Sequence, residues 1–131
     1  MRVQRLRARV QFQCLLGTPA VARTAHFALH RLAPAADGAA LFAPPDAAWL
    51  GAMTPKRWAR RAVTRNAIRR QIYAVGENLD LPLNAGAHLV RLRAAFAPAQ
   101  FPSASSAALK RAVRAELLQL FTRSHDPRNG S

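Results

Sequence analysis

Apolar residues along the chain follow two kinds of spacing, and these divide it into helices and strands. Helical spacing occurs over residues 10–16, 58–75 and 103–122. Strand patterns, most of them alternating, occur over residues 24–32, 49–54 and 86–94, with residues 41–42 as a further short strand segment. We therefore expect a helix, two or three strands, a helix, a strand and a last helix, which make one α+β domain with a small sheet packed by helices.

The helix predicted over residues 58–75 has two unlike faces. Ile68, Ile72 and Val75 fall at i, i+4 and i+7 and form an apolar seam that can pack on a core. At about 100° per residue, the polar residues gather on the side away from that seam. They are Arg65, Asn66, Arg69 and Arg70.

Residues 56–73 are also the most basic part of the chain. They contain no acid and seven basic residues, which are Lys56, Arg57, Arg60, Arg61, Arg65, Arg69 and Arg70. The chain of 131 residues has a net charge of +14. Of its twenty basic residues only Lys56 and Lys110 are not arginine, and the guanidinium fork matches phosphate oxygens. A high-GC coding bias explains arginine over lysine but not the shortage of acids, so we expect a polyanionic partner, with nucleic acid first.

The chain contains little that could carry catalysis or hold a metal. Its six acids are scattered, and Cys14 is its only cysteine, so neither a disulfide within the chain nor a Cys-based metal site is expected. His26 and His30 stand four residues apart on a predicted strand, which favours surface or nucleic-acid contact over a shared metal. No apolar run is long enough to span a bilayer, and we expect a cytoplasmic protein with no membrane association and no obligate protein partner.

Aromatic residues add candidate stacking positions for unpaired bases. They are Phe12, Phe27, Trp58 and Tyr73. Each could instead pack in the core. The core alternative is favoured for Phe27, is about even for Phe12, and stays open for the other two.

The basic segment resembles the protein component of bacterial ribonuclease P. The resemblance rests on Lys56-Arg57, followed by an Arg-Ala-Val-x-Arg-Asn-x-x-Arg-Arg pattern at residues 61–70. The resemblance covers roughly residues 5–123 and implies one RNA-binding domain over residues 1–123, in the order α-β-β-β-α-β-α. It also implies a four-stranded sheet and a left-handed β-α-β crossover, against the general rule. The polar residues 124–131, with Pro127 and Gly130, are expected to be a disordered tail.

The resemblance also implies a function. Such a protein is a subunit of an endoribonuclease, in which a catalytic RNA and its Mg²⁺ ions hydrolyse precursor tRNA to remove the 5′ leader. No catalytic or metal-binding residue is then expected in this chain. The implied RNA-binding residues are Lys56, Arg57, Arg60, Arg61, Arg65, Asn66, Arg69 and Arg70. The implied cleft for the leader has Phe12, Leu16, Phe27 and His30 as candidates, although Leu16 and His30 stand where the family commonly has aromatic residues.

Two other classes of protein fit the same charge. A ribosomal or RNA-chaperone protein would bind RNA without affecting tRNA processing. A DNA-binding protein would place the basic helix in a major groove, but the helix-turn-helix pattern is poor.

Overall fold

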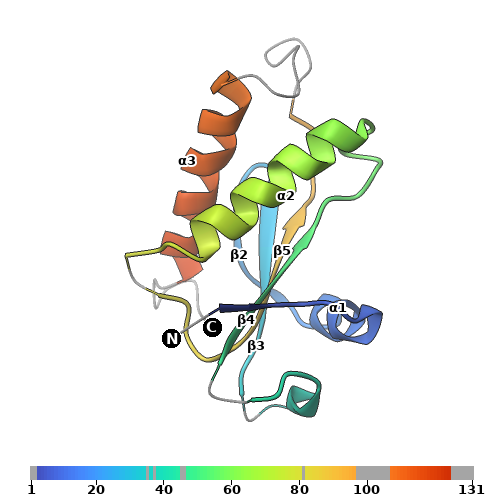
Figure 1. The fold of residues 1–131 in the computed structure, drawn as a ribbon, viewed down its shortest axis with the longest axis vertical. Coiled ribbons are helices and arrows are strands. Elements are labelled where there is room, and N and C mark those ends of the chain that lie inside the picture. Colours follow the sequence, from blue (N-terminus) through green and yellow to red (C-terminus); the bar gives the residue numbers. More distant parts are fainter. Residues whose placement is uncertain are drawn as a thin grey trace.

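A five-stranded mixed sheet has one helix on one face and two helices on the other (Figure 1). This computed structural model describes residues 3–34, 36, 38–44, 47–80, 82–96 and 107–124. The strands are β1 (Val3–Arg5), β2 (Ala20–Arg23), β3 (Phe27–Leu32), β4 (Ala48–Met53) and β5 (Gly86–Leu92). The helices are α1 (Arg9–Leu16), α2 (Ala62–Gly76) and α3 (Ala107–Ser124), with a short 3-10 helix η1 (Ala39–Leu41). The predicted α+β class is confirmed.

The strands lie in the order β1-β4-β5-β3-β2. The edge strand β1 pairs in parallel with β4, and β4 pairs in parallel with β5. The strands β3 and β2 continue the sheet in antiparallel pairing. The predicted β-α-β unit is therefore present as β4-α2-β5, and the left hand of its crossover stays a prediction.

The larger core lies between the sheet and the helices α2 and α3. Alternate residues of each strand enter it, among them Phe27 and Leu29 of β3. The predicted seam of Ile68, Ile72 and Val75 is buried there, and α3 adds Leu117 and other apolar residues. Apolar spacing therefore placed both helices correctly against the sheet.

A second, smaller core lies between the other face of the sheet and α1. Leu15 of α1 packs there with Leu6, Leu32 and Leu89. Gly51 of β4 allows this close approach, because a Cβ at that position would stand 2.4 Å from Cδ1 of Leu6 and 3.0 Å from Cε1 of Phe12. Both faces of the sheet are therefore covered.

Two local predictions are wrong. The sheet has five strands and not four, because residues 3–5 and residues 20–23, for which no strand was predicted, form β1 and β2, while residues 41–42 form no strand. Residues 39–41 form a 3-10 helix where a strand segment was expected at 41–42. These segments are too short to show a hydrophobic period.

The basic helix begins at Ala62, four residues later than predicted. Pro55 closes a turn instead, because its carbonyl oxygen accepts hydrogen bonds from the backbone N–H groups of Trp58 (3.0 Å) and Ala59 (3.2 Å). The helix α3 extends to Ser124, one residue past the predicted domain end. The first four residues of the helix predicted over residues 103–122, where the side chain of Ser103 or Ser105 was expected to cap it, lie outside the described residues, as does the tail after Ser124.

Candidate nucleic-acid interface

The predicted RNA-binding residues are divided between a loop and a helix. Lys56, Arg57, Arg60 and Arg61 lie in the loop that joins β4 to α2. The other four predicted residues, Arg65, Asn66, Arg69 and Arg70, lie on α2. Seven of these eight residues are exposed and Arg65 is half-buried. The structure therefore brings all eight to one end of α2, although only half of them are helical.

Arg65 ties the loop to the helix. Its Nη1 donates hydrogen bonds to the backbone carbonyl oxygens of Ala59 (3.0 Å) and Arg60 (2.8 Å). Ala59 is itself buried in the larger core. The guanidinium group of Arg65 thus fixes the course of the loop, in addition to contributing charge.

Arg69 is also held by internal hydrogen bonds. Its Nη1 donates to Oδ1 of Asn66 (2.9 Å), and its Nη2 donates to Oγ1 of Thr54 at the end of β4 (3.2 Å). Arg70, one residue further on, makes no hydrogen bond or ion pair with the described residues. The segment therefore combines guanidinium groups fixed in position with others that can turn towards a ligand.

The two aromatic residues of this region pack on the larger core and each lies beside an arginine. Trp58 is half-buried, and the guanidinium carbon of Arg57 lies 5.1 Å from its ring centroid. Tyr73 is likewise half-buried, and Arg5 of β1 lies 4.2 Å from its ring centroid. Each ring contacts the core, which agrees with the core alternative, and has a cation over it; stacking on bases stays a prediction.

The candidates for a leader cleft do not all lie together. Phe12 and Leu16 of α1 flank the smaller core, where Phe12 is half-buried and Leu16 is 40% exposed. His30 lies on the same face of the sheet. Phe27 is fully buried in the larger core on the opposite face, which agrees with the core alternative for that residue. Of the four candidates, only Phe12 and Leu16 can therefore contribute to a surface beside α1, and His30 lies on the same face of the sheet as that surface.

His30 is a buried histidine and not a surface one, being 6% exposed. Its Nδ1 lies 2.9 Å from the carbonyl oxygen of Thr18, so Nδ1 carries the proton and Nε2 accepts a hydrogen bond from Nε of Arg91 (3.3 Å). Burial lowers the pKa of His30, and the charges of Arg91 and Arg23 lower it further, although the bond to Thr18 opposes this. His30 is therefore a neutral partner that orients Arg91.

Arg91 joins this surface through strand alternation. It shares a face of β5 with Leu89, which packs in the smaller core under α1. Alternation along β5 turns Arg91 to the face away from Val90 and Leu92, but it gives no sign of the contact with His30. The pair is brought together by the antiparallel register of β3 and β5, in which Leu89 lies opposite His30.

The described acids lie apart from one another, and two of them, Glu77 and Glu116, are already bound to other residues. Glu77 pairs with Arg5 (2.7 Å). Glu116 of α3 accepts hydrogen bonds from Oγ1 of Thr24 (2.6 Å) and the backbone of His26 (2.7 Å), and lies 2.7 Å from Nδ1 of His26. His26 thus joins the β2–β3 turn to α3. Among the described residues, no three His, Cys, Asp or Glu side chains gather as metal ligands.

Comparison with known proteins assigns the family. A sequence model of the family described as Ribonuclease P matches residues 1–123. The chain belongs to the Ribonuclease P family. The Ribonuclease P protein components of Bordetella parapertussis and Bordetella bronchiseptica are each 43% identical over 79 residues, which is 60% of this chain and 60% of theirs.

Solved structures of this family have the same fold. The Staphylococcus aureus RNase P protein superposes with a TM-score of 0.63 at 16% identity, over 92% of this chain and 94% of that one. A mutant of it with defective mRNA degradation activity gives 0.60 at 16% identity, over 90% and 85%. In the present chain, no helix among the described residues is both long and apolar enough to cross a membrane.

Proposed function

We propose that this Ribonuclease P family chain is the protein subunit of a ribonucleoprotein that removes the 5′ leader from precursor tRNA. The observation that carries the proposal is the fixed basic segment at the start of α2. Four basic residues of the loop and three arginines of the helix meet there without an acid, and Arg65 and Arg69 hold the arrangement by internal hydrogen bonds. This segment binds the phosphates of the catalytic RNA.

The surface beside α1 contacts the leader. Phe12 and Leu16 offer apolar contact there, and Arg91, oriented by His30, offers a positive charge. An unpaired leader needs both kinds of contact, because its bases are exposed and its phosphates are charged. The two surfaces therefore have different roles: the basic segment binds the catalytic RNA, and the surface beside α1 binds the leader.

The chain contributes binding, and the RNA with its Mg²⁺ ions contributes hydrolysis. The described acids do not fit a magnesium site, because Glu77 and Glu116 are each bound to other side chains and lie on different elements. Mg²⁺ prefers several oxygen ligands in octahedral arrangement, and RNA phosphates provide such oxygens. We therefore place the metal on the RNA and its substrate.

Reconstitution with the cognate catalytic RNA tests the proposal. The full chain is added at low magnesium, and the rate of precursor-tRNA cleavage is measured. We expect stimulation by the chain, reduced stimulation by Arg69→Ala, and unchanged stimulation by Lys110→Ala, which removes an exposed charge from α3. Absence of stimulation, or co-sedimentation with ribosomes alone, would show that the chain serves another RNA.

A further inference from the structure

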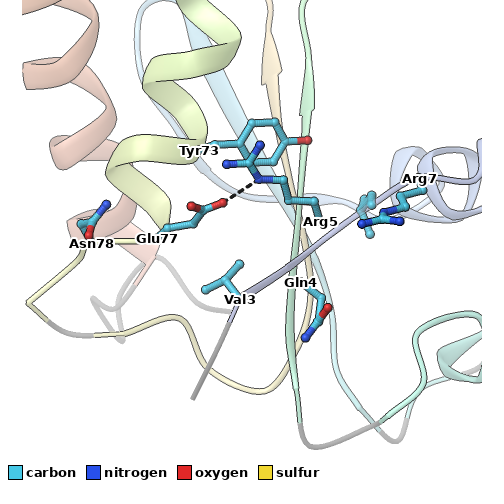
Figure 2. A pocket seen from close by; sticks show the side chains of 8 residues that line it. Val3, Gln4, Arg5, Arg7, Tyr73, Glu77 and Asn78 are labelled. Carbon is cyan, nitrogen blue, oxygen red and sulfur yellow. Dashed lines mark hydrogen bonds and ion pairs between the residues drawn. The ribbon is translucent and has the colours of Figure 1, made fainter.

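An open pocket of about 840 Å³ lies between the edge strand β1 and the C-terminal end of α2 (Figure 2). Arg5 and Arg7 line it from the β1 side, and Tyr73, Glu77 and Asn78 line it from the α2 side. Its volume is in the range of small-molecule sites. Of its lining residues only Tyr73 belongs to the basic segment of residues 56–73, and none is one of the seven basic residues of that segment.

The centre of the pocket is a stacked platform. The guanidinium group of Arg5 lies 4.2 Å from the ring centroid of Tyr73, and its Nε donates to Oε1 of Glu77 at 2.7 Å. Figure 2 shows the guanidinium group of Arg5 against the Tyr73 ring, with its ion pair to Glu77 as a dashed line. The side chain of Arg5 is nevertheless 54% exposed, so the flat guanidinium plane is accessible to a ligand. A planar cation fixed in this way stacks well on a nucleobase.

Hydrogen-bond acceptors lie next to the platform. Oε2 of Glu77 makes no hydrogen bond with the described residues, since the bond to Arg5 uses Oε1. Asn78 uses its Nδ2 to bond the carbonyl oxygen of Ala74 (2.7 Å), which leaves Oδ1 as an acceptor. A ligand here should present adjacent N–H donors on a flat ring. Among the bases of RNA, guanine offers such donors together at N1 and N2.

We propose that this pocket binds one unpaired guanine nucleotide of the RNA partner. The base stacks on Arg5, its N1–H and N2–H groups donate to Oε2 of Glu77 and Oδ1 of Asn78, and Arg7 contacts a phosphate. The source of the nucleotide rests on the proposed function, whereas recognition of guanine rests on the pocket alone. The platform is also continuous with the basic segment, because Tyr73 follows Arg69 by four residues, or about 6 Å along the axis of α2.

An extended acidic peptide is the competing occupant, since β1 is the edge of the sheet. The strand has only three residues, which gives an added strand very few backbone partners. A peptide would also leave the guanidinium plane and the acceptor of Glu77 without matching groups. The chemistry of the pocket therefore favours a base.

Binding of short single-stranded RNAs that differ in one central base tests the proposal. Each RNA is titrated against the full chain by fluorescence anisotropy, with the base set to G, A, C or U. We expect the G-containing RNA to bind roughly tenfold more tightly than the A-containing one, as one bidentate base contact predicts. Guanosine monophosphate should shift the NMR signals of Arg5 and Tyr73.

Two variants test whether the pocket recognises guanine or only attracts any RNA by its charge. Glu77→Gln should bring the affinities for G and A within about twofold of each other, by replacing one carboxylate oxygen with a donor. Tyr73→Phe should keep the preference, because the ring and its stacking remain. Equal affinities for G and A in the unchanged chain, or equal gains for all RNAs with Glu77→Gln, would overturn the proposal. If the chain still stimulates precursor-tRNA cleavage when the guanine proposal fails, the proposed function stands without it.

Discussion

Replacing Arg65 with alanine tests whether this residue stabilises the loop before α2 as well as contributing charge to the basic segment. Arg65 donates from Nη1 to the carbonyl oxygens of Ala59 and Arg60. Hydrogen bonds to charged groups contribute about 1.5–3 kcal/mol each in buried sites. Because Arg65 is half-buried and Arg60 is exposed, screening by solvent reduces the total to about 2 kcal/mol.

That loss has a measurable size. A change of about 2 kcal/mol alters the ratio of folded to unfolded chain roughly 30-fold. In a domain of this length it lowers Tm by roughly 6–10 °C. Thermal unfolding followed by circular dichroism should show this shift for Arg65→Ala. For Arg70→Ala the free energy of unfolding should change by less than about 0.5 kcal/mol, because Arg70 bonds no described residue.

Binding to the catalytic RNA should distinguish the same two variants. Arg70→Ala should reduce the slope of log K against log salt by about 0.7–0.9, the contribution of one phosphate contact. Arg65→Ala should lose more affinity, because the loop with Lys56 and Arg57 is no longer held. Arg65→Lys keeps the charge but not the fork that bridges both carbonyls. Full recovery of stability and affinity by lysine would refute the structural role.

The remaining predictions concern the two cores. Leu117→Ala, at a fully buried position, should lower the free energy of unfolding by about 2–5 kcal/mol in urea, whereas Leu118→Ala, at a 46% exposed position, should change it by less than about 1 kcal/mol. Gly51→Ala should displace Leu6 and Phe12, cost about 1–3 kcal/mol, and weaken binding of precursor tRNA relative to mature tRNA; an equal effect on both RNAs would contradict a leader contact. His30→Phe should remove part of the loss of stability below about pH 6.5. The pKa of His30 is lowered in the folded chain, so only the unfolded chain takes up a proton at this side chain as the pH falls below that value. This proton uptake changes the free energy of unfolding by at most about 1.4 kcal/mol per pH unit, and identical pH profiles for the variant and the unchanged chain would contradict the prediction.

Long amphipathic segments were predictable from the sequence. The spacing of Ile68, Ile72 and Val75 defines a buried face whichever partner covers it, and the structure buries all three. Alternation likewise placed Phe27 and Leu29 in a core. The basic density of residues 56–73 indicated the interface, because no neighbouring acid could neutralise it.

The details of the interface depend on distant parts of the chain. The prediction that His30 lies at the surface is wrong because α1 covers the second face of the sheet, which alternation on one strand cannot show. The internal bonds of Arg65 depend on the turn at Pro55, which delays the start of the helix. The contact of Arg5 with Glu77 joins residues 72 positions apart, and no local pattern records it.

The last strand along the sequence lies in the middle of the sheet. Residues 86–92 form β5, which alone joins the β1–β4 pair to the β3–β2 pair. A growing chain without β5 contains only two separate pairs of strands, and an isolated pair is marginally stable in water. The 39 residues from the end of β4 at Met53 to the end of β5 at Leu92 take roughly 2–8 s to add at about 5–20 residues per second, and the sheet stays divided during that time. The basic loop before α2 is added during this time, so the nascent chain contains a dense cluster of positive charge before its sheet is joined.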